Sequence, residues 1–246
     1  MRNWIAAMIL SLTPFLALGA TGKVITYEVN GQPYEGYFIN PGKDAPFILM
    51  IHDWDGLTDY EVKRANMLAE KGYAVFAADL FGKGVRPTKD VDKRQHTGEL
   101  YKDREKMRAL MMGALETAKA NGANIDNAIA MGYCFGGAAV LELARSGANL
   151  KGFATFHGGL QTPEGQDYAK TRAPVLIMHG GADTAVTIDD VATLAKELEA
   201  ANVPYEIAVY SGAPHAFTVF GEERYREDAD QKSWALFNRF LEANLK

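Results

Sequence analysis

The sequence predicts one α/β domain built around a mostly parallel, doubly wound sheet. Short apolar runs recur along the chain, and segments with helical periodicity separate them. The length of 246 residues suits a single large domain. With 26 basic and 31 acidic residues the net charge is −5, which argues against nucleic-acid binding because such a surface needs a basic patch.

The first twenty residues have the pattern of a secretory signal peptide. A short basic start precedes an uncharged stretch from Trp4 to Ala20, which Pro14 interrupts and small residues end. An uncleaved membrane anchor is the alternative, although the stretch is short for a spanning helix. We therefore expect residues 1–20 to be removed and residues 21–246 to form the domain. The mature protein is expected to be periplasmic or secreted, with no membrane association.

The apolar runs predict the strands. A hairpin of two antiparallel strands comes first, over residues 23–39, because Asn30 and Gly31 form a turn pair between two alternating segments. The later runs are short and almost continuously apolar, as in strands buried on both faces of a parallel sheet. They cover residues 47–52, 73–79, 127–133, 151–157, 174–180 and 205–211.

Helical patterns lie between these runs. One long helix is predicted over residues 98–121, charged at its start and apolar later. Another is predicted over 187–201, where Thr187 and Asp190 have the spacing of a capping box. A final amphipathic helix contains Trp234 and the apolar residues that follow it at helical spacing.

Polar residues directly follow several predicted strands. Ligands of open parallel sheets bind beyond the carboxyl ends of the strands, so these residues are the first site candidates. They are His52, Asp53, Trp54, Asp79, Cys134, His157, His179, Asp183 and His215. His52, His157 and His179 lack partners at metal-ligand spacing, so we expect structural roles for them, with no metal and no cofactor. His96 is expected to lie at the surface.

The only cysteine of the chain, Cys134, stands in the segment MGYCFGG between a predicted strand and a helical pattern. This is the form of a nucleophile elbow with cysteine in place of serine. Gly132 and Gly136 would let the strand and helix approach closely. The helix N-terminus and an adjacent imidazole would favour a thiolate. A buried structural thiol is the alternative. The segment lacks the glycine spacing of a dinucleotide-binding turn.

An acid and a histidine follow this cysteine in the order of a hydrolase triad. Asp183 lies just past a predicted strand, and His215 lies in the loop after the last strand. Each alone has an ordinary alternative, as a turn carboxylate and a loop histidine. Together with Cys134 they predict that His215 takes the thiol proton and later activates water, while Asp183 holds the imidazole tautomer.

These segments resemble the dienelactone hydrolase family of the α/β-hydrolase superfamily. The resemblance rests on IHDWDGL, GYAVFAADLFG, MGYCFGG, LIMHGGADTAV and GAPHAF, and covers essentially all of the predicted mature chain. It implies the α/β-hydrolase fold, with Cys134, Asp183 and His215 as the triad. It also implies an oxyanion hole formed by the backbone N–H groups of Phe135 and Trp54.

The resemblance places Asp53 where the family usually has a glutamate that contacts the thiol and helps to activate it. Capping of the helix that begins near Thr58 is an equally good interpretation of Asp53. Dienelactone hydrolases hold their substrate carboxylate with two arginines. Near the first position this sequence has Lys83, with Arg86 close by, and at the second it has Val219.

Lys83 and Arg86 are therefore the predicted substrate contacts, and a dienelactone carboxylate is not predicted to be the substrate group. The polar stretch 82–98 beside the site is either a lid that contacts substrate or a solvated loop. The predicted function is hydrolysis of a small-molecule ester or lactone through a thioester acyl-enzyme, by a monomer or weak homo-oligomer. The alternatives are a non-catalytic periplasmic binding protein and a thiol redox sensor, which would need an intermolecular disulfide.

Overall fold

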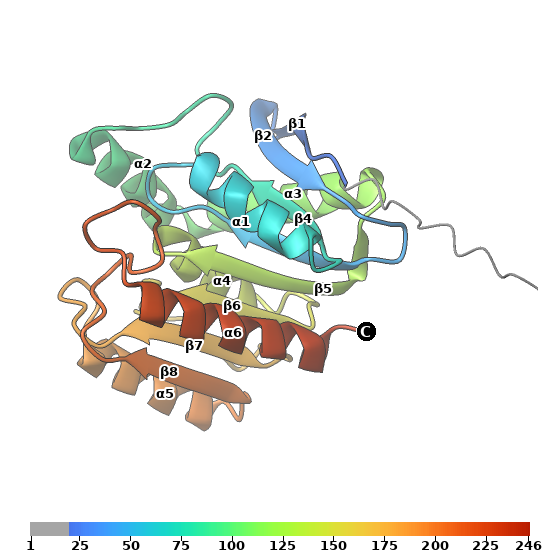
Figure 1. Ribbon diagram of the computed structural model, residues 1–246. Coiled ribbons are helices and arrows are strands. Elements are labelled where there is room, and N and C mark those ends of the chain that lie inside the picture. The colour runs from blue at the N-terminus through green and yellow to red at the C-terminus, as the bar shows by residue number, and fades with distance from the viewer. Residues whose placement is uncertain (1–19) are drawn as a thin grey trace, which may run out of the picture.

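An eight-stranded sheet forms the centre of residues 20–246, the part of the chain that the computed structural model describes (Figure 1). The strand order is β1-β2-β4-β3-β5-β6-β7-β8. The strands are β1 (Lys23–Val29), β2 (Gln32–Ile39), β3 (Pro46–Ile51), β4 (Ala74–Ala78), β5 (Asn124–Tyr133), β6 (Gly152–Phe156), β7 (Val175–Gly180) and β8 (Tyr205–Tyr210). The predicted signal peptide lies outside the described residues except for Ala20.

The sheet is parallel from β4 to β8 and antiparallel at its first edge. Strand β3 pairs in parallel with β4 on one side and β5 on the other, while β2 pairs antiparallel with both β1 and β4. Asn30 and Gly31 form the turn of the first hairpin with φ of 50° and 74°, as a two-residue hairpin turn requires. The predicted hairpin and parallel sheet are confirmed.

Helices cover both faces of the sheet (Figure 1). Helices α3 (Arg104–Ala120), α4 (Phe135–Arg145) and α5 (Ile188–Ala200) pack on one face, and α1 (Asp59–Ala69) and α6 (Glu227–Asn244) pack on the other. Thr187 and Asp190 form the capping box of α5 as predicted. Among residues 20–246, none of the helices combines the length and apolar character needed to cross a membrane.

The segment between β4 and β5 differs from the prediction. It forms two helices, α2 (Asp90–Lys102) and α3, rather than one helix from residue 98. Helix α2 ends and α3 begins at Asp103. The Asp103 side chain caps α3 by accepting a hydrogen bond from the Lys106 N–H at 2.9 Å. Much of the polar stretch 82–98 is therefore helical. Only Thr97 and Leu100 of α2 are buried, which explains its weak apolar periodicity.

Candidate active site

Cys134 occupies a sharp turn between β5 and α4. Its backbone has φ of 49° and ψ of −110°, a region that non-glycine residues rarely adopt. A Cβ atom on Gly132 would lie 2.3 Å from the Gly136 carbonyl, and one on Gly136 would lie 2.3 Å from the Ile51 oxygen. The glycines are therefore required by the close approach of strand and helix, and the strained turn presents the thiol at the end of the sheet.

Asp183 and His215 lie beside this thiol. His215 Nε2 is 3.1 Å from Cys134 Sγ, and His215 Nδ1 is 2.7 Å from Asp183 Oδ2. Burial alone would raise the pKa of the Asp183 carboxyl, but its hydrogen bonds with His215 and with backbone N–H groups lower it. The carboxylate therefore accepts a hydrogen bond from the Nδ1–H group. The proton stays on Nδ1, which leaves Nε2 free to accept the thiol proton.

The surroundings of Cys134 favour the neutral thiol over the thiolate. Burial raises the pKa of Cys134 well above its usual value, and the adjacent Asp53 raises it further through its negative charge and its hydrogen bond with the thiol. The Phe135 N–H at the start of α4 acts in the opposite direction but is outweighed. The helix N-terminus therefore acts in the direction predicted from the sequence, but its effect on the pKa is smaller than those of burial and Asp53.

The two N–H groups predicted to form an oxyanion hole flank the cysteine. That of Phe135 follows it directly, and that of Trp54 lies in the loop after β3. The Trp54 N–H donates to Asp53 Oδ1 at 2.5 Å, so this donor is occupied by the neighbouring carboxylate. Asp53 does not cap α1, because Thr58 is the N-cap residue and forms a capping box with Glu61.

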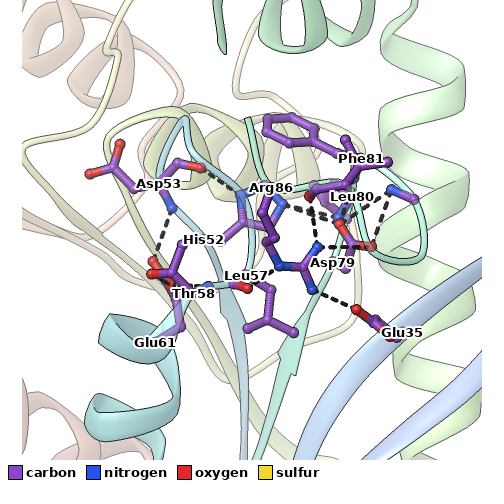
Figure 2. Close-up of polar contacts among 12 residues, drawn as sticks. Glu35, His52, Asp53, Leu57, Thr58, Glu61, Asp79, Leu80, Phe81 and Arg86 are labelled. Atoms are coloured by element: carbon purple, nitrogen blue, oxygen red, sulfur yellow. Dashed lines mark hydrogen bonds and ion pairs between the residues drawn. The ribbon is translucent and has the colours of Figure 1, made fainter. Parts of the chain in front are cut away.

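Buried side chains hold the loop that carries Asp53 and Trp54 (Figure 2). Glu61 Oε1 accepts a hydrogen bond from the Asp53 N–H at 3.3 Å, and Glu61 Oε2 accepts one from the Thr58 N–H at 2.8 Å. His52 Nε2 accepts from the Leu80 N–H at 3.0 Å, so its Nδ1 carries the proton and donates to the Asp53 carbonyl. Burial raises the pKa of Glu61 to about 8. Hydrogen bonds of His52 at the start of the loop and of Glu61 to Thr58 at its end therefore hold the loop at both ends.

Cys134 opens into a cavity of about 440 Å³. The cavity is lined by Asp53, Trp54, Arg94, Tyr101, Cys134, Gly159, Ala182, Thr184, Ala185, Val186, Pro214, His215, Ala216 and Arg224. Cys134 and His215 therefore face a space large enough for a small molecule, whereas Asp183 is buried behind His215.

Comparison with known proteins identifies the family of the chain. The sequence model of the dienelactone hydrolase family matches residues 34–245, most of the chain. The chain belongs to the dienelactone hydrolase family. The resemblance read from the motifs and the predicted α/β-hydrolase fold are confirmed, and the protein is a dienelactone hydrolase-like hydrolase.

Individual relatives are distant but cover nearly the whole chain. A protein of Aquifex aeolicus named "Putative carboxymethylenebutenolidase" is 24% identical and aligns over 92% of this chain and 100% of its own. The solved structure of "m3DLH" is 30% identical with a TM-score of 0.87, covering 93% of this chain and 100% of its own. A dienelactone hydrolase-like promiscuous phosphotriesterase from metagenomic libraries is 27% identical with a TM-score of 0.86 and the same coverage.

Within this family member, the predicted substrate contacts lie away from the cavity. Arg86 Nη2 donates to Glu35 Oε1 at 2.8 Å, its Nη1 lies 3.7 Å from Asp79 Oδ2, and its Nε donates to the Leu57 carbonyl (Figure 2). Arg86 therefore connects the loop after β3, through Leu57, to Glu35 within β2 and to Asp79, which directly follows β4. Lys83 is exposed and is not among the residues that line the cavity.

The cations that do line the cavity are Arg94 and Arg224, which the sequence interpretation missed. Arg94 lies in α2, inside the polar stretch 82–98 that was singled out as a candidate lid, so a partial signal existed. Arg224 lies in the segment between β8 and α6, where no motif indicated it. Val219 is not among the lining residues.

The other strand-end histidines are held by protein partners. His157 Nε2 is 2.8 Å from Thr218 Oγ1, and His179 Nε2 donates to the Val186 carbonyl at 3.0 Å. Burial lowers the pKa of both and keeps them neutral. His96 is half-buried against Phe81, with ring centroids 5.2 Å apart, rather than lying free at the surface. No group of three or more potential metal-binding side chains occurs within residues 20–246.

Proposed function

We propose that the protein hydrolyses small-molecule esters or lactones with Cys134 as the nucleophile, His215 as the base and Asp183 as the residue that orients it. The observation that carries the proposal is the continuous contact from Asp183 to His215 to Cys134, at 2.7 and 3.1 Å, on the wall of one cavity. Membership of the dienelactone hydrolase family supports the same reaction class.

The first half-reaction forms a thioester. His215 Nε2 takes the thiol proton as Sγ bonds to the carbonyl carbon, and the carbonyl π electrons move onto oxygen. When the tetrahedral intermediate collapses, the bond to the leaving oxygen breaks and His215 returns the proton to that oxygen. Water then gives a proton to His215 as its oxygen bonds to the thioester carbon. The carbon–sulfur bond breaks as this second intermediate collapses, His215 returns the proton to Sγ, and the acid leaves.

Two backbone donors serve the oxyanion in this proposal, the N–H groups of Phe135 and Trp54. Since Asp53 Oδ1 accepts the Trp54 N–H at 2.5 Å in the free protein, the carboxylate has to turn away before a carbonyl oxygen takes its place. This movement also removes a negative charge from beside Sγ, which favours ionisation of the thiol. Asp53 thus links entry of the substrate to activation of the nucleophile.

Substrate contacts are reassigned in the proposal. Arg94 and Arg224 are the cations available to substrate, in place of Lys83 and Arg86. Secretion or export to the periplasm after removal of residues 1–20, and a monomeric or weakly associating state, stay predictions from the sequence.

The test is a screen of the mature protein against lactones, aryl esters and thioesters, with Cys134→Ala alongside. We expect at least a thousandfold loss of kcat/KM in the variant, roughly the scale on which triad nucleophiles contribute. Circular dichroism and thermal melting of both proteins verify that the variant folds.

Full turnover by Cys134→Ala would contradict the proposal. Absence of hydrolysis across the whole panel would favour a binding protein that retains the fold. A redox role predicts instead an oxidant-dependent, dithiothreitol-reversible dimer linked through Cys134, visible by non-reducing electrophoresis.

A further inference from the structure

A second cavity, here called the side chamber, adjoins the cavity of Cys134. Its volume is about 360 Å³, and the two cavities share Tyr101, Gly159, Ala185 and Val186 as walls. Tyr101 lies at their junction, since it lines both cavities, while Cys134 lines the main one. The side chamber is therefore a branch of the same cleft, entered past Tyr101 and close to the nucleophile.

The positions of the other site residues indicate which part of a substrate enters this branch. The leaving oxygen must lie near His215 Nε2, because that atom supplies its proton. Pro214 and Ala216, the chain neighbours of His215, line the main cavity and not the side chamber. The leaving group therefore belongs in the main cavity, and the acyl group has the side chamber as its available space.

The walls of the side chamber change from apolar to polar. Ala138, Leu160 and Val186 contribute apolar surface, and Arg104 contributes a cation. The guanidinium of Arg104 is held in place, since its Nε donates to the Tyr101 carbonyl at 2.9 Å and it lies over the Tyr101 ring at 4.8 Å. Such a fixed fork of donors suits an oxygen acceptor.

The charge of Arg104 is only partly balanced. Its Nη1 lies 3.8 Å from Glu142 Oε2, but Arg145 donates to the same oxygen at 2.9 Å, and Arg108 donates to Oε1 at 2.6 Å. One buried carboxylate thus faces three guanidinium groups, and Arg104 is the most distant of them.

The opposite charge at the side chamber is already engaged. Asp190 accepts hydrogen bonds from the Thr187 N–H at 2.7 Å and from the Thr187 hydroxyl at 2.8 Å, within the first turn of α5. The helix N-terminus stabilises this carboxylate. The other carboxylate oxygen, Oδ1, accepts from the Gln161 side-chain amide at 3.4 Å. Both oxygens of Asp190 thus have donors within the protein, whereas the ion pair of Arg104 with Glu142 is 3.8 Å long and leaves the guanidinium more available to a ligand.

We propose that the side chamber is the acyl-binding subsite and that Arg104 binds an oxygen acceptor at the far end of the acyl chain. The inference rests on the proposed function. At about 30 Å³ for each small heavy-atom group, the volume holds roughly ten non-hydrogen atoms. The favoured substrates are esters of acids with about six carbons that end in a carboxylate or carbonyl group.

The experiment compares four p-nitrophenyl esters, the acetate, the hexanoate, the monoester of adipic acid and the ester of 6-aminohexanoic acid, by kcat/KM. Arg104→Gln removes the cation, and Gln161→Trp fills the rim of the side chamber from an exposed position. Arg108→Gln is the matched control, because Arg108 lies in the same helix and binds Glu142 but does not line the side chamber.

We expect the wild type and Arg108→Gln to prefer the adipate ester to the hexanoate by about tenfold or more, the scale of a charge-assisted hydrogen bond. Arg104→Gln should bring this ratio close to one. Gln161→Trp should lower the hexanoate to acetate ratio by roughly tenfold, since the longer acyl group loses its space.

An adipate to hexanoate ratio that stays the same in Arg104→Gln would overturn the inference. So would a preference for the ester of 6-aminohexanoic acid, which would assign the side chamber to Asp190. The two proposals fail separately. If ester hydrolysis does not depend on Cys134, the proposed function fails, whereas Cys134-dependent hydrolysis with flat acyl ratios defeats the acyl subsite alone.

Discussion

Replacement of Asp183 by asparagine perturbs one hydrogen bond of the site and preserves the loop around it. Asp183 Oδ1 accepts the N–H groups of Ala185 and Val186 at 2.8 and 2.9 Å, and an asparagine carbonyl accepts both equally well. Only the atom facing His215 Nδ1 at 2.7 Å changes, from a carboxylate oxygen to an NH₂ group.

That change reverses the tautomer of the histidine. An NH₂ group donates to His215 Nδ1, so the proton moves to Nε2, which then points a donor at Cys134 Sγ and cannot take the thiol proton. In a serine protease triad the same substitution lowers kcat by about 10⁴. We expect a loss of about 10³ to 10⁴ here. The unfolding free energy should fall by only about 1 kcal/mol, the difference between a charge-assisted and a neutral hydrogen bond.

The assay is kcat/KM for p-nitrophenyl acetate between pH 6 and 9, together with urea unfolding. Asp167→Asn is the matched control, because that carboxylate also accepts a backbone N–H, from Ala169 at 2.9 Å, but lines neither cavity and does not contact His215. A loss of less than tenfold in Asp183→Asn, with the fold intact, would refute the tautomer argument.

Three further changes test other parts of the site. Gly136→Ala should cost about 3 kcal/mol or more of unfolding free energy in urea titration, because its Cβ would lie 2.3 Å from the Ile51 oxygen; a cost below 1 kcal/mol would show that the elbow tolerates a side chain. Asp53→Asn removes a charge that raises the pKa of Cys134, so the pH at which iodoacetamide alkylation accelerates should move down; an upward or absent shift counts against that role. Arg86→Gln should lower the unfolding free energy by about 1–3 kcal/mol and leave KM unchanged, since its partners are Glu35, Asp79 and the Leu57 carbonyl; a large rise in KM with unchanged stability would restore Arg86 as a substrate contact.

The sequence was informative wherever local chemistry determines structure. Continuous apolar runs predicted the parallel strands, and Asn30 with Gly31 predicted the hairpin turn, because both patterns act through neighbouring residues. The glycines around Cys134 marked the turn for the same reason. Asp183 and His215 were found by their order after strands, which the α/β topology converts into proximity.

Contacts between distant segments were less accessible to sequence reasoning. Arg86 lies in a segment whose position in the sequence suggested a substrate contact. The carboxylates of Glu35 and Asp79 instead hold its guanidinium outside the cavity of Cys134. Helix α2 was missed because few of its residues are buried, and Arg94 was missed with it. The thiolate was predicted from the helix N-terminus and an adjacent imidazole, whereas the proximity of Asp53 to the sulfur depends on how the loop after β3 folds.

The central claim is that Cys134 carries the acyl group during turnover. Intact-mass spectrometry of the mature protein, quenched in acid within milliseconds of mixing with p-nitrophenyl acetate, tests it directly. We predict an adduct of one acetyl group that peptide mapping assigns to Cys134, that hydroxylamine removes, and that is absent from Cys134→Ala. Steady hydrolysis by a folded protein that never acquires an adduct at Cys134, or whose adduct maps to another residue, would contradict the account.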